Sequence, residues 1–309
     1  MLSYDVVVIG AGPGGASAAI YAKRNGTKVV VVDSGLIGGQ LSLSHEVENY
    51  LGIPRMSGQE WSELVKKHLD SIDIPVIIDK VVDIEKTNTG FTLTLASSQK
   101  IECYAVVIAI GTEHRHLNVN GENEFFGKGV SYCATCDGYF FRDKTVGVIG
   151  GGNTALEYAL FLKDIAKKVY LIHRRDEFRA EEVLVKRVMT ETGIEKMMNK
   201  TVDRFEGNEV LKKIFLKDVR TGEISSIDAD GVFIAVGTVP NSIHFKNISV
   251  KVDENGFIIT NDKQMTNING IYAAGDVTGK GRAQAIGAAA QGMIAGIEAS
   301  LYVKQLMKK

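Results

Sequence analysis

The sequence predicts an α/β fold made of two three-layer (ββα) domains, with the second domain inserted into the first. The main observation is a strand, glycine turn, helix and second strand, which occur in this order twice. The register of the two copies agrees, since Gly10 and Asp33 are as far apart in the sequence as Gly150 and His173. The end of the chain starts no third copy, so it has to pack onto one of these two units.

The first copy begins with a buried strand at residues 5–9, because a β-branched run is typical of a parallel strand covered on both faces. A turn at 10–15, a helix at 16–24 and a strand at 28–32 come next, and Asp33 ends that strand. Such a glycine turn brings backbone N–H groups and a helix N-terminus to a pyrophosphate. The acid accepts hydrogen bonds from a ribose, which favours FAD or NAD. These features predict a Rossmann-like site.

The second copy repeats this plan with a strand at 145–149, a glycine turn at 150–155, a helix at 155–162 and a strand at 169–172. A single glycine-turn match is weak, because such turns also arise for packing. Two matches, each followed by a helix and a strand, indicate two dinucleotide-binding Rossmann-like domains.

The residues after the last strand differ between the copies. His173 stands at the position that Asp33 occupies in the first copy, and Arg174 and Arg175 follow it directly. Guanidinium groups suit a 2′-phosphate, and Arg179 is predicted one helical turn further on, so this domain is expected to bind NADPH rather than NADH. The alternative is that the arginines begin a solvated helix.

Each copy closes with a buried strand that ends in Gly-Thr, at residues 106–112 and 232–238. The segment after the second of these strands belongs to the first domain. We therefore assign residues 1–115 and 242–309 to an FAD-binding domain, and residues 116–241 to an inserted NADPH-binding domain.

Three further features of the first domain favour a flavin. Residues 38–40 (Gly-Gly-Gln) provide more backbone that can approach a ligand closely. Asp276 follows a short strand, where an acid is expected to bind the ribityl chain. The helix predicted at 283–302 begins near Gln284, and its N-terminus is expected to face the pyrimidine ring and stabilise negative charge there.

Cys133 and Cys136 form a C-x-x-C motif that Asp137 follows directly. A zinc site needs four ligands, and Cys103 is the only other cysteine. Two inert core cysteines are a second interpretation, but an acid and a glycine beside the pair suit an accessible turn. A redox-active dithiol is favoured, because two nucleotide sites on the same chain supply a route for electrons. Asp137 is the predicted carrier of the exchange proton, and no metal site is predicted.

Composition and charge are those of a globular cytoplasmic protein. The 309 residues include 36 Lys or Arg and 37 Asp or Glu, which leaves no basic excess for nucleic-acid binding. The N-terminus lacks the basic segment of a signal peptide, and no stretch approaches the about 18 apolar residues of a membrane span. Three cysteines are too few for a secreted disulfide framework. Partners among nucleic acids or membranes are not expected.

These motifs closely resemble those of the bacterial-type, low-molecular-weight thioredoxin reductases, which are class II pyridine nucleotide-disulfide oxidoreductases. The resemblance covers nearly the whole chain, and a cysteine motif just upstream of the second glycine turn is highly specific to that family. The matching segments are residues 10–15, 38–40, 46–49, 133–137, 150–155, 173–176 and 275–277.

The resemblance implies a homodimeric enzyme that passes electrons from NADPH through FAD and a disulfide to thioredoxin or a similar, glutaredoxin-like protein. Cys136 matches the thiol nearer the flavin, Cys133 the thiol that attacks thioredoxin, and Asp137 the acid. The family is known to rotate its NADPH domain, and the two chain crossings between the domains are expected to act as hinges.

The motifs and the resemblance together predict the cofactor contacts. FAD is expected to contact Gly10, Gly12, Pro13, Gly14, Gly15, Asp33, Gly39, Gln40, Asn49, Gly111, Gly275, Asp276, Ala283, Gln284 and Ala285. NADPH is expected to contact Gly150, Gly152, Asn153, Thr154, His173, Arg174, Arg175, Arg179 and Gly237.

Two positions depart from the family pattern. Residues 282–284 (Arg-Ala-Gln) stand where Tyr-Arg-Gln is common, and Tyr158 replaces the second glutamate usually found after the NADPH turn. Three other functions stay open: a related flavoprotein fed by ferredoxin or a reduced deazaflavin, a ferredoxin–NADP reductase, which needs no cysteine pair, and a nucleotide-binding sensor with a cysteine switch. Arg174 and Arg175 favour NADPH as the donor.

Overall fold

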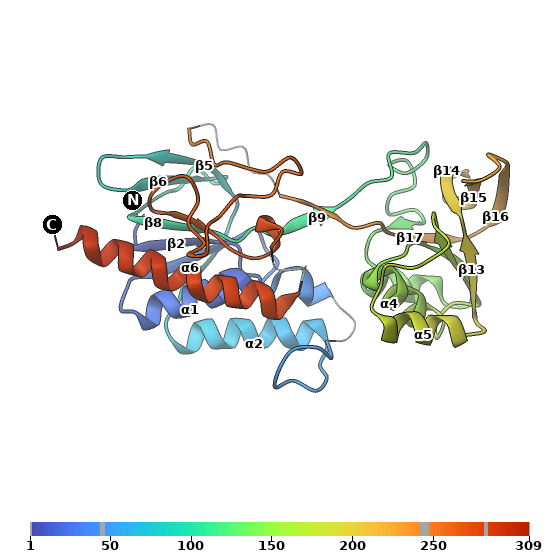
Figure 1. Cartoon of the computed structure of the whole chain (residues 1–309), viewed down its shortest axis with the longest axis horizontal. Helices are drawn as coiled ribbons and strands as arrows, with labels where there is room; N and C mark the ends of the chain where they lie inside the picture. Colours follow the sequence, from blue (N-terminus) through green and yellow to red (C-terminus); the bar gives the residue numbers. More distant parts are fainter. Residues whose placement is uncertain (1, 44–46, 242–246, 281–283, 309) are drawn as a thin grey trace. The chain divides into compact units, whose positions relative to one another are not determined.

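The computed structural model describes residues 2–43, 47–241, 247–280 and 284–308. The chain divides into two compact units (Figure 1), the first made of Met1–Glu113 with Val239–Lys309 and the second of His114–Thr238. The second unit is therefore one continuous segment between two parts of the first.

The chain crosses between the units slightly earlier than the sequence suggests, after residues 113 and 238 instead of 115 and 241. Two short strands occupy these crossings, β9 (Thr112–His114) and β18 (Thr238–Pro240), and they pair with each other.

A five-stranded parallel sheet forms the middle layer of the first unit. Its strands lie in the order β19 (Ile271–Ala273), β8 (Ala105–Ile108), β2 (Val6–Ile9), β3 (Val29–Asp33) and β4 (Val76–Ile78). The strand from the C-terminal segment, β19, pairs with β8, so this segment completes the sheet that the N-terminal segment begins.

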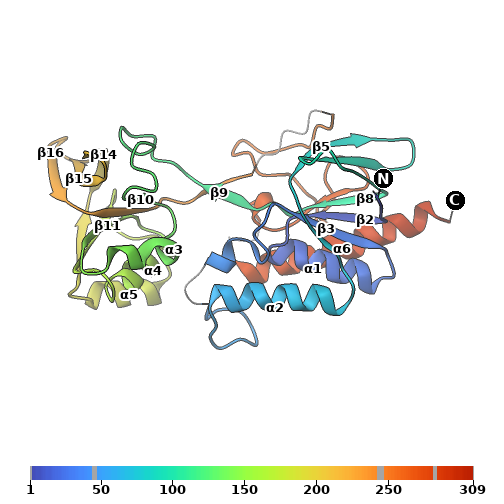
Figure 2. The same ribbon diagram turned by 180° about the vertical axis from the view of Figure 1, so that it is seen from behind.

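Three long helices of the first unit lie on one side of this sheet (Figure 2): α1 (Pro13–Arg24), α2 (Gly58–Ser71) and α6 (Ala285–Leu306). Two glycines let α6 pack closely on α1. A Cβ atom at Gly292 would lie 1.9 Å from the carbonyl oxygen of Gly14, and one at Gly296 would lie 2.2 Å from that of Ala18. Because a real Cβ cannot come so close, both positions require glycine.

By length and mean hydropathy alone, α6 could cross a membrane, which differs from the sequence prediction. Its alanine and isoleucine residues account for much of this hydropathy. Its buried residues include Ala295, Ala299 and Val303, which pack in a core cluster with α1 and the parallel sheet. We therefore interpret α6 as a core helix of the first unit.

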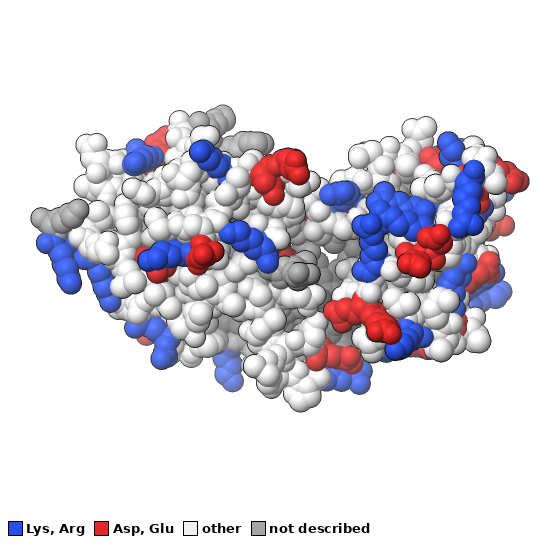
Figure 3. All heavy atoms as spheres, in the orientation of Figure 1, with Lys and Arg blue, Asp and Glu red and all other residues white. Residues whose placement is uncertain are grey.

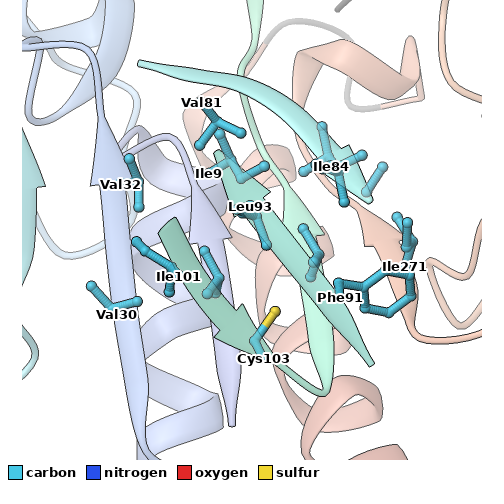
Figure 4. Packing of buried hydrophobic residues seen from close by; sticks show 14 of the residues in the cluster. Ile9, Val30, Val32, Val81, Ile84, Phe91, Leu93, Ile101, Cys103 and Ile271 are labelled. Atoms are coloured by element: carbon cyan, nitrogen blue, oxygen red, sulfur yellow. The ribbon is translucent and has the colours of Figure 1, made fainter. Parts of the chain in front are cut away.

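The other face of the parallel sheet is covered by a second sheet. Its strands lie in the order β1 (Leu2–Ser3), β7 (Lys100–Cys103), β6 (Phe91–Leu95) and β5 (Val81–Lys86). Between the two sheets lies an apolar cluster, in which Ile9 and Val32 of the parallel sheet meet Leu93 and Ile101 of the second sheet (Figure 4). The first unit thus has the predicted three layers.

The second unit is built in the same way around a parallel sheet. Its strands lie in the order β10 (Val130–Ser131), β17 (Gly231–Ala235), β11 (Thr145–Gly150), β12 (Lys168–His173) and β13 (Ile194–Met198). Val148 packs toward the helices and its neighbour Ile149 toward a small second sheet, because successive side chains of a strand point to opposite faces.

The outer layers of the second unit are helical on one side and a sheet on the other. The helices are α3 (Ala134–Asp137), α4 (Asn153–Leu162) and α5 (Glu182–Thr190). The antiparallel strands are β14 (Lys200–Gly207), β15 (Leu211–Asp218) and β16 (Ile224–Asp228). The predicted α/β class with two Rossmann-like units is confirmed.

Both helices that follow a glycine turn begin earlier than predicted. The first begins at Pro13 instead of residue 16, and the second at Asn153 instead of residue 155. Proline suits the first position of a helix, because its φ is already helical and the missing N–H would have no partner inside the helix. Each helix N-terminus therefore lies within its glycine turn.

Candidate functional site

The first glycine turn joins β2 to α1 and depends on glycine at several positions. Gly10 has a φ of +101°, and a Cβ there would lie 2.3 Å from the carbonyl oxygen of Ala109. A Cβ at Gly15 would lie 1.8 Å from the carbonyl oxygen of Gly10. Gly12 is the N-cap of α1 and Pro13 its first residue. The first N–H groups of α1 have no partners within the helix, which makes the turn suitable for a phosphate.

A second stretch of backbone lies against this turn. It is a short 3₁₀ helix, η1 (Gly39–Leu43). A Cβ at Gly39 would lie 2.9 Å from the Cα atom of Gly12, and the side-chain amide of Gln40 donates to the carbonyl of Thr112. Gly12 and Gly39 therefore expose backbone without side chains, so a ligand can approach the backbone closely there.

Asp33 lies at the end of β3 and is buried. Its Oδ2 accepts the N–H of Ala11 at 2.7 Å, while Oδ1 accepts the N–H groups of Gly35 at 2.8 Å and Leu36 at 2.7 Å. A carboxylate offers about four acceptor positions, so these contacts leave room for about one more donor. Asp33 shapes the turn first, and one ribose hydroxyl fits the remaining position on Oδ2.

Asp276 begins a short 3₁₀ segment just after β19. Its Oδ1 atom is buried and has no hydrogen-bond partner among the described residues, and burial raises the pKa of this carboxyl group. A buried acceptor without a donor is costly, so it marks a place for a ligand hydroxyl.

Two other residues predicted to contact FAD are hydrogen-bonded to each other in the same unit, since the side chain of Asn49 donates to that of Gln284 at 3.1 Å.

The second glycine turn joins β11 to α4 and repeats the geometry of the first. Gly150 has a φ of +152°, and a Cβ there would lie 2.2 Å from the carbonyl oxygen of Ala235. Gly152 is the N-cap of α4. The amide of Asn153 donates to the carboxylate of Glu181 at 2.9 Å, and its oxygen accepts the N–H of Glu181 at 2.8 Å. These two bonds fasten the segment before α5 to the turn.

That segment, between β12 and α5, carries the arginines and is not helical, since α5 begins only at Glu182. The prediction that Arg179 lies one helical turn after Arg175 is therefore wrong. The chain bends back instead, and the N–H of Arg179 donates to the carbonyl of Gly151 at 2.6 Å. A backbone bond to the turn, and not helical periodicity, brings this arginine to the site.

Three arginines and three acids share this segment. Arg174 and Arg179 are exposed and Arg175 is half-buried. Partial burial, followed by the charges of Arg179 and Arg174, lowers the pKa of the Arg175 guanidinium. Two of the acids have partners outside the segment, since Asp176 faces Arg220 at 3.5 Å and Glu181 accepts from the amide of Asn153. Figure 3 shows Lys and Arg side chains on the visible face of the second unit, with Asp and Glu side chains among them. Such a group of cations favours an anionic ligand.

His173, which the sequence places at the ligand, lies beneath the turn. It is buried, its Nε2 is 3.0 Å from the carbonyl oxygen of Glu177, and a Cβ at Gly151 would lie 2.2 Å from its Cε1 atom. Burial and the charges of Arg175 and Arg174 lower the pKa of this imidazole, so it is neutral at pH 7. Its visible role is to support the glycine turn.

Cys133 and Cys136 form a disulfide, with their Cα atoms 5.3 Å apart. Cys133 is the N-cap of α3, and its Sγ accepts the N–H of Cys136 at 3.2 Å. Cys136 is exposed and Cys133 is half-buried. The third cysteine, Cys103, is buried in the first unit, and burial raises the pKa of its thiol. The described residues contain no cluster of His, Cys, Asp and Glu that could hold a metal ion.

Asp137 ends α3 and is bound to the start of the same turn. The hydroxyl of Ser131 donates to its Oδ2 at 2.6 Å, and the N–H of Cys133 donates to the Ser131 oxygen at 3.0 Å. The Ser131 hydroxyl thus links the Asp137 carboxylate to the backbone N–H of Cys133. The sequence gives no sign of this contact, because a serine six residues before an aspartate has no recognisable spacing.

Comparisons with known proteins agree with this arrangement. Residues 4–292 match the model of the pyridine nucleotide-disulphide oxidoreductase family. The thioredoxin reductase of Bacillus subtilis is 38% identical over 309 residues, covering 99% of this chain and 96% of that protein. The crystal structure of Lactococcus lactis thioredoxin reductase superposes with a TM-score of 0.94 at 36% identity, covering 98% and 99% of the two chains. The chain belongs to the thioredoxin reductase family.

A third relative bears on the electron donor. The structure of a ferredoxin-flavin thioredoxin reductase from Clostridium acetobutylicum is 31% identical and has a TM-score of 0.54, with 100% of both chains covered. As a member of the family, the chain is a flavoprotein oxidoreductase that uses a pyridine nucleotide and a redox-active disulfide.

The other predicted cofactor contacts lie near the two glycine turns or outside the described residues. Gly111 and Gly237 have φ values of +67° and +98°, a conformation that favours glycine. Thr154 is exposed at the start of α4, and Ala285 is the first residue of α6. Ala283 lies outside the described residues.

A polar cluster near the disulfide has no counterpart in the sequence predictions. The hydroxyl of Tyr132 donates to the buried carboxylate of Glu122 at 2.5 Å and lies 2.6 Å from Nδ1 of His116. Burial opposes ionisation of Glu122, but donors that include Tyr132 and the N–H of Leu117 lower the pKa of this carboxyl group. The three side chains are spread over 17 positions of irregular chain, so no local pattern could reveal them.

Proposed function

We propose that this chain is an NADPH-dependent thioredoxin-disulfide reductase, which passes electrons from NADPH through FAD to the Cys133–Cys136 disulfide and on to oxidised thioredoxin. The observation that carries the proposal is the disulfide beside Asp137, in the same unit as an arginine-lined dinucleotide turn. A sensor with a cysteine switch would need no second nucleotide turn of this kind.

The first unit is the proposed FAD domain, and its residues fit that group. The unpartnered oxygen of Asp276 suits a ribityl hydroxyl, and the free position on Asp33 suits a ribose hydroxyl. The close backbone at Gly12 and Gly39 suits a pyrophosphate. When bound, the flavin would accept two electrons as a hydride and pass them to a disulfide.

The second unit is the proposed NADPH domain. One segment, hydrogen-bonded to the glycine turn, carries Arg174, Arg175 and Arg179. Burial is the main cause of the lowered pKa of Arg175, and repulsion by the other two arginines adds to it. A 2′-phosphate relieves this repulsion and accepts bidentate hydrogen bonds from guanidinium groups. The dinucleotide pyrophosphate would lie at the N-terminus of α4, where Gly152 and Asn153 begin the helix.

The cysteine pair carries out thiol–disulfide exchange. In the dithiol state, the Cys133 thiolate attacks a thioredoxin sulfur, the thioredoxin S–S bond breaks, and a mixed disulfide forms. The Cys136 thiolate then attacks Cys133 Sγ, which restores the Cys133–Cys136 disulfide and releases the second thioredoxin thiolate. Two electrons and two protons leave on thioredoxin. Asp137, held by Ser131, is the proposed proton carrier.

Two exposed aromatic residues lie next to the disulfide. Tyr139 and Phe140, in the 3₁₀ helix Gly138–Phe141 that follows α3, are 54% and 75% exposed. Large aromatic side chains often form the centre of a protein interface. We assign them to the surface on which thioredoxin docks.

The resemblance also supports a homodimer in the cytoplasm, with no nucleic-acid or membrane partner. Exposed Ile286 and Leu301 give α6 apolar surface that a second copy could cover. Sedimentation of the flavin-loaded protein tests this part of the proposal, and a monomer at micromolar concentration would contradict it.

Steady-state assays of thioredoxin reduction with NADPH test the proposed function. Cys133→Ser and Cys136→Ser should each lower turnover by about 1,000-fold or more, because neither single thiol can complete the exchange. Reduction of the flavin by NADPH should persist in both variants. Cys103→Ala, which changes the buried cysteine of the first unit, is the matched control. Full turnover of a ferredoxin by both serine variants would instead identify a ferredoxin–NADP reductase.

A related enzyme fed by reduced ferredoxin or deazaflavin is the second candidate, because a ferredoxin-flavin thioredoxin reductase is among the similar structures. The two are distinguished by their donors. Thioredoxin reduction with ferredoxin but not with NADPH would favour this candidate and exclude the first.

A further inference from the structure

Tyr158 contacts the backbone on both sides of Cys133. It lies on α4, the helix that begins at the second glycine turn. Its hydroxyl donates to the carbonyl oxygen of Tyr132 at 3.2 Å, and the N–H of Ala134 lies close enough to the same oxygen to lower the pKa of the phenol. One oxygen atom therefore hydrogen-bonds to the peptide group before Cys133 and lies beside the peptide group after it.

These two contacts restrain the conformation of the cysteine. The φ and ψ of a residue are the rotations that relate its two flanking peptide planes. Cys133 has φ −132° and ψ 98°, while the residues after it are helical. Binding both planes to one side chain opposes rotation at Cys133, which sets the direction of its Sγ toward Cys136.

The phenol suits this role because it can donate and accept at the same time. Burial, with a smaller effect from the charge of Glu157, raises the pKa of Tyr158 to about 12. The hydroxyl therefore keeps its proton and adds no negative charge beside a cysteine thiolate. An ionised glutamate, the residue that the family commonly has here, can accept the Ala134 N–H but cannot donate to the Tyr132 carbonyl.

We propose that Tyr158 is a positioning residue for thiol–disulfide exchange, which holds the backbone of Cys133 in the disulfide-forming conformation and connects it to the helix of the nucleotide turn. The inference rests on the proposed redox role of the cysteine pair. It also gives a function to the tyrosine that departs from the family pattern.

The dithiol–disulfide equilibrium of the cysteine pair tests this inference. The flavin-loaded full chain is equilibrated in dithiothreitol redox buffers, alkylated, and its oxidised fraction measured by mass spectrometry. Tyr158→Phe keeps the ring but removes the hydroxyl. It should shift the equilibrium constant about five-fold toward the dithiol, the effect of an ordinary hydrogen bond, which is about 20 mV for a two-electron couple. Tyr170→Phe, in β12 of the same unit, should leave the potential unchanged.

A second variant tests the charge argument. Tyr158→Glu should move the pH profile of Cys133 alkylation in the reduced protein to higher pH, because a carboxylate disfavours a nearby thiolate. If Tyr158→Phe leaves the potential at the wild-type value and lowers only the unfolding temperature, the hydroxyl is merely structural and the inference is wrong. Neither measurement uses NADPH or thioredoxin, so failure of the proposed function would not by itself change these results.

Discussion

The two glycine turns share one backbone plan but present opposite charges to a ligand. In the first unit, the acid after the second strand, Asp33, is buried and accepts three backbone N–H groups. In the second unit, arginines occupy the corresponding segment, and only the histidine before them is buried. The turn geometry therefore favours a dinucleotide in each unit, and we propose that the residues after the second strand decide which one.

The two turns also differ in how they are supported. The first is held by a carboxylate that reaches back to Ala11, and the second by the imidazole of His173, which fills the space under Gly151. Only the imidazole is seen to exclude a side chain, at Gly151. We propose that Asp33 both supports the turn and selects the ligand in the first unit, whereas in the second unit His173 supports the turn and the arginines after it select the ligand.

The largest expected effect comes from adding one methyl group to the first turn. Gly15→Ala places a Cβ 1.8 Å from the carbonyl oxygen of Gly10, so the turn has to open. We expect the flavin to be lost on purification and the first unit to be destabilised by about 3 kcal/mol. Gly152→Ala, at the position that corresponds to Gly12, is the control in the second unit, because a Cβ there meets no atom within 4 Å. Flavin content and unfolding midpoint measure the difference.

An equal loss of stability in both variants would contradict this prediction, because only the Cβ at position 15 meets backbone atoms.

The next effect concerns the arginines. Replacing Arg174 and Arg175 by alanine removes two charge-assisted contacts to a 2′-phosphate, so KM for NADPH should rise about 100-fold. KM for NADH should change less than about three-fold, because NADH carries no such phosphate. Arg187→Ala, on the exposed face of α5, is the control. An unchanged KM for NADPH would show that the arginines do not select the nucleotide.

The smallest effect sharpens the picture of the first unit. Burial raises the pKa of Asp276, so its ionised form opposes folding at any pH above this pKa. In flavin-free protein at pH 7, Asp276→Asn should therefore raise the free energy of unfolding by about 1 kcal/mol. The gain should vanish when the pH falls below the ordinary pKa of aspartate, where both side chains are neutral.

The same variant should weaken flavin binding about ten-fold, because an amide accepts a ribityl hydrogen bond less well than a carboxylate. Urea unfolding across pH and fluorescence titration with FAD measure the two effects. A variant that is less stable than wild type at pH 7 would contradict the interpretation of the buried oxygen.

Much of the fold and of the site can be predicted from the sequence, because the information is local. A strand, turn, helix and strand lie within about 25 residues, and Gly15 is required by a contact with the nearby carbonyl of Gly10. The cysteine pair and the residues after β12 are likewise local patterns. The domain assignment could be proposed because the second copy has the same spacing as the first.

The features that escape prediction depend on contacts between distant segments. The contact of His173 with Gly151 could not be predicted, because β12 and the glycine turn are neighbours only in the folded sheet. Arg179 reaches the turn through a backbone bond, which helical periodicity does not describe. Tyr158 contacts Tyr132 across 26 residues, and only the packing of α4 beside α3 brings the two together.

The most direct test of the account is an anaerobic titration of the flavin-loaded protein with NADPH, followed by oxidised thioredoxin. We predict that NADPH bleaches the flavin absorbance and that thioredoxin restores it, which would demonstrate both ends of the electron path in one cuvette. Slow or absent bleaching by NADPH, with dithionite still reducing the flavin, would contradict the assignment of the arginine segment to NADPH and favour a ferredoxin or deazaflavin donor.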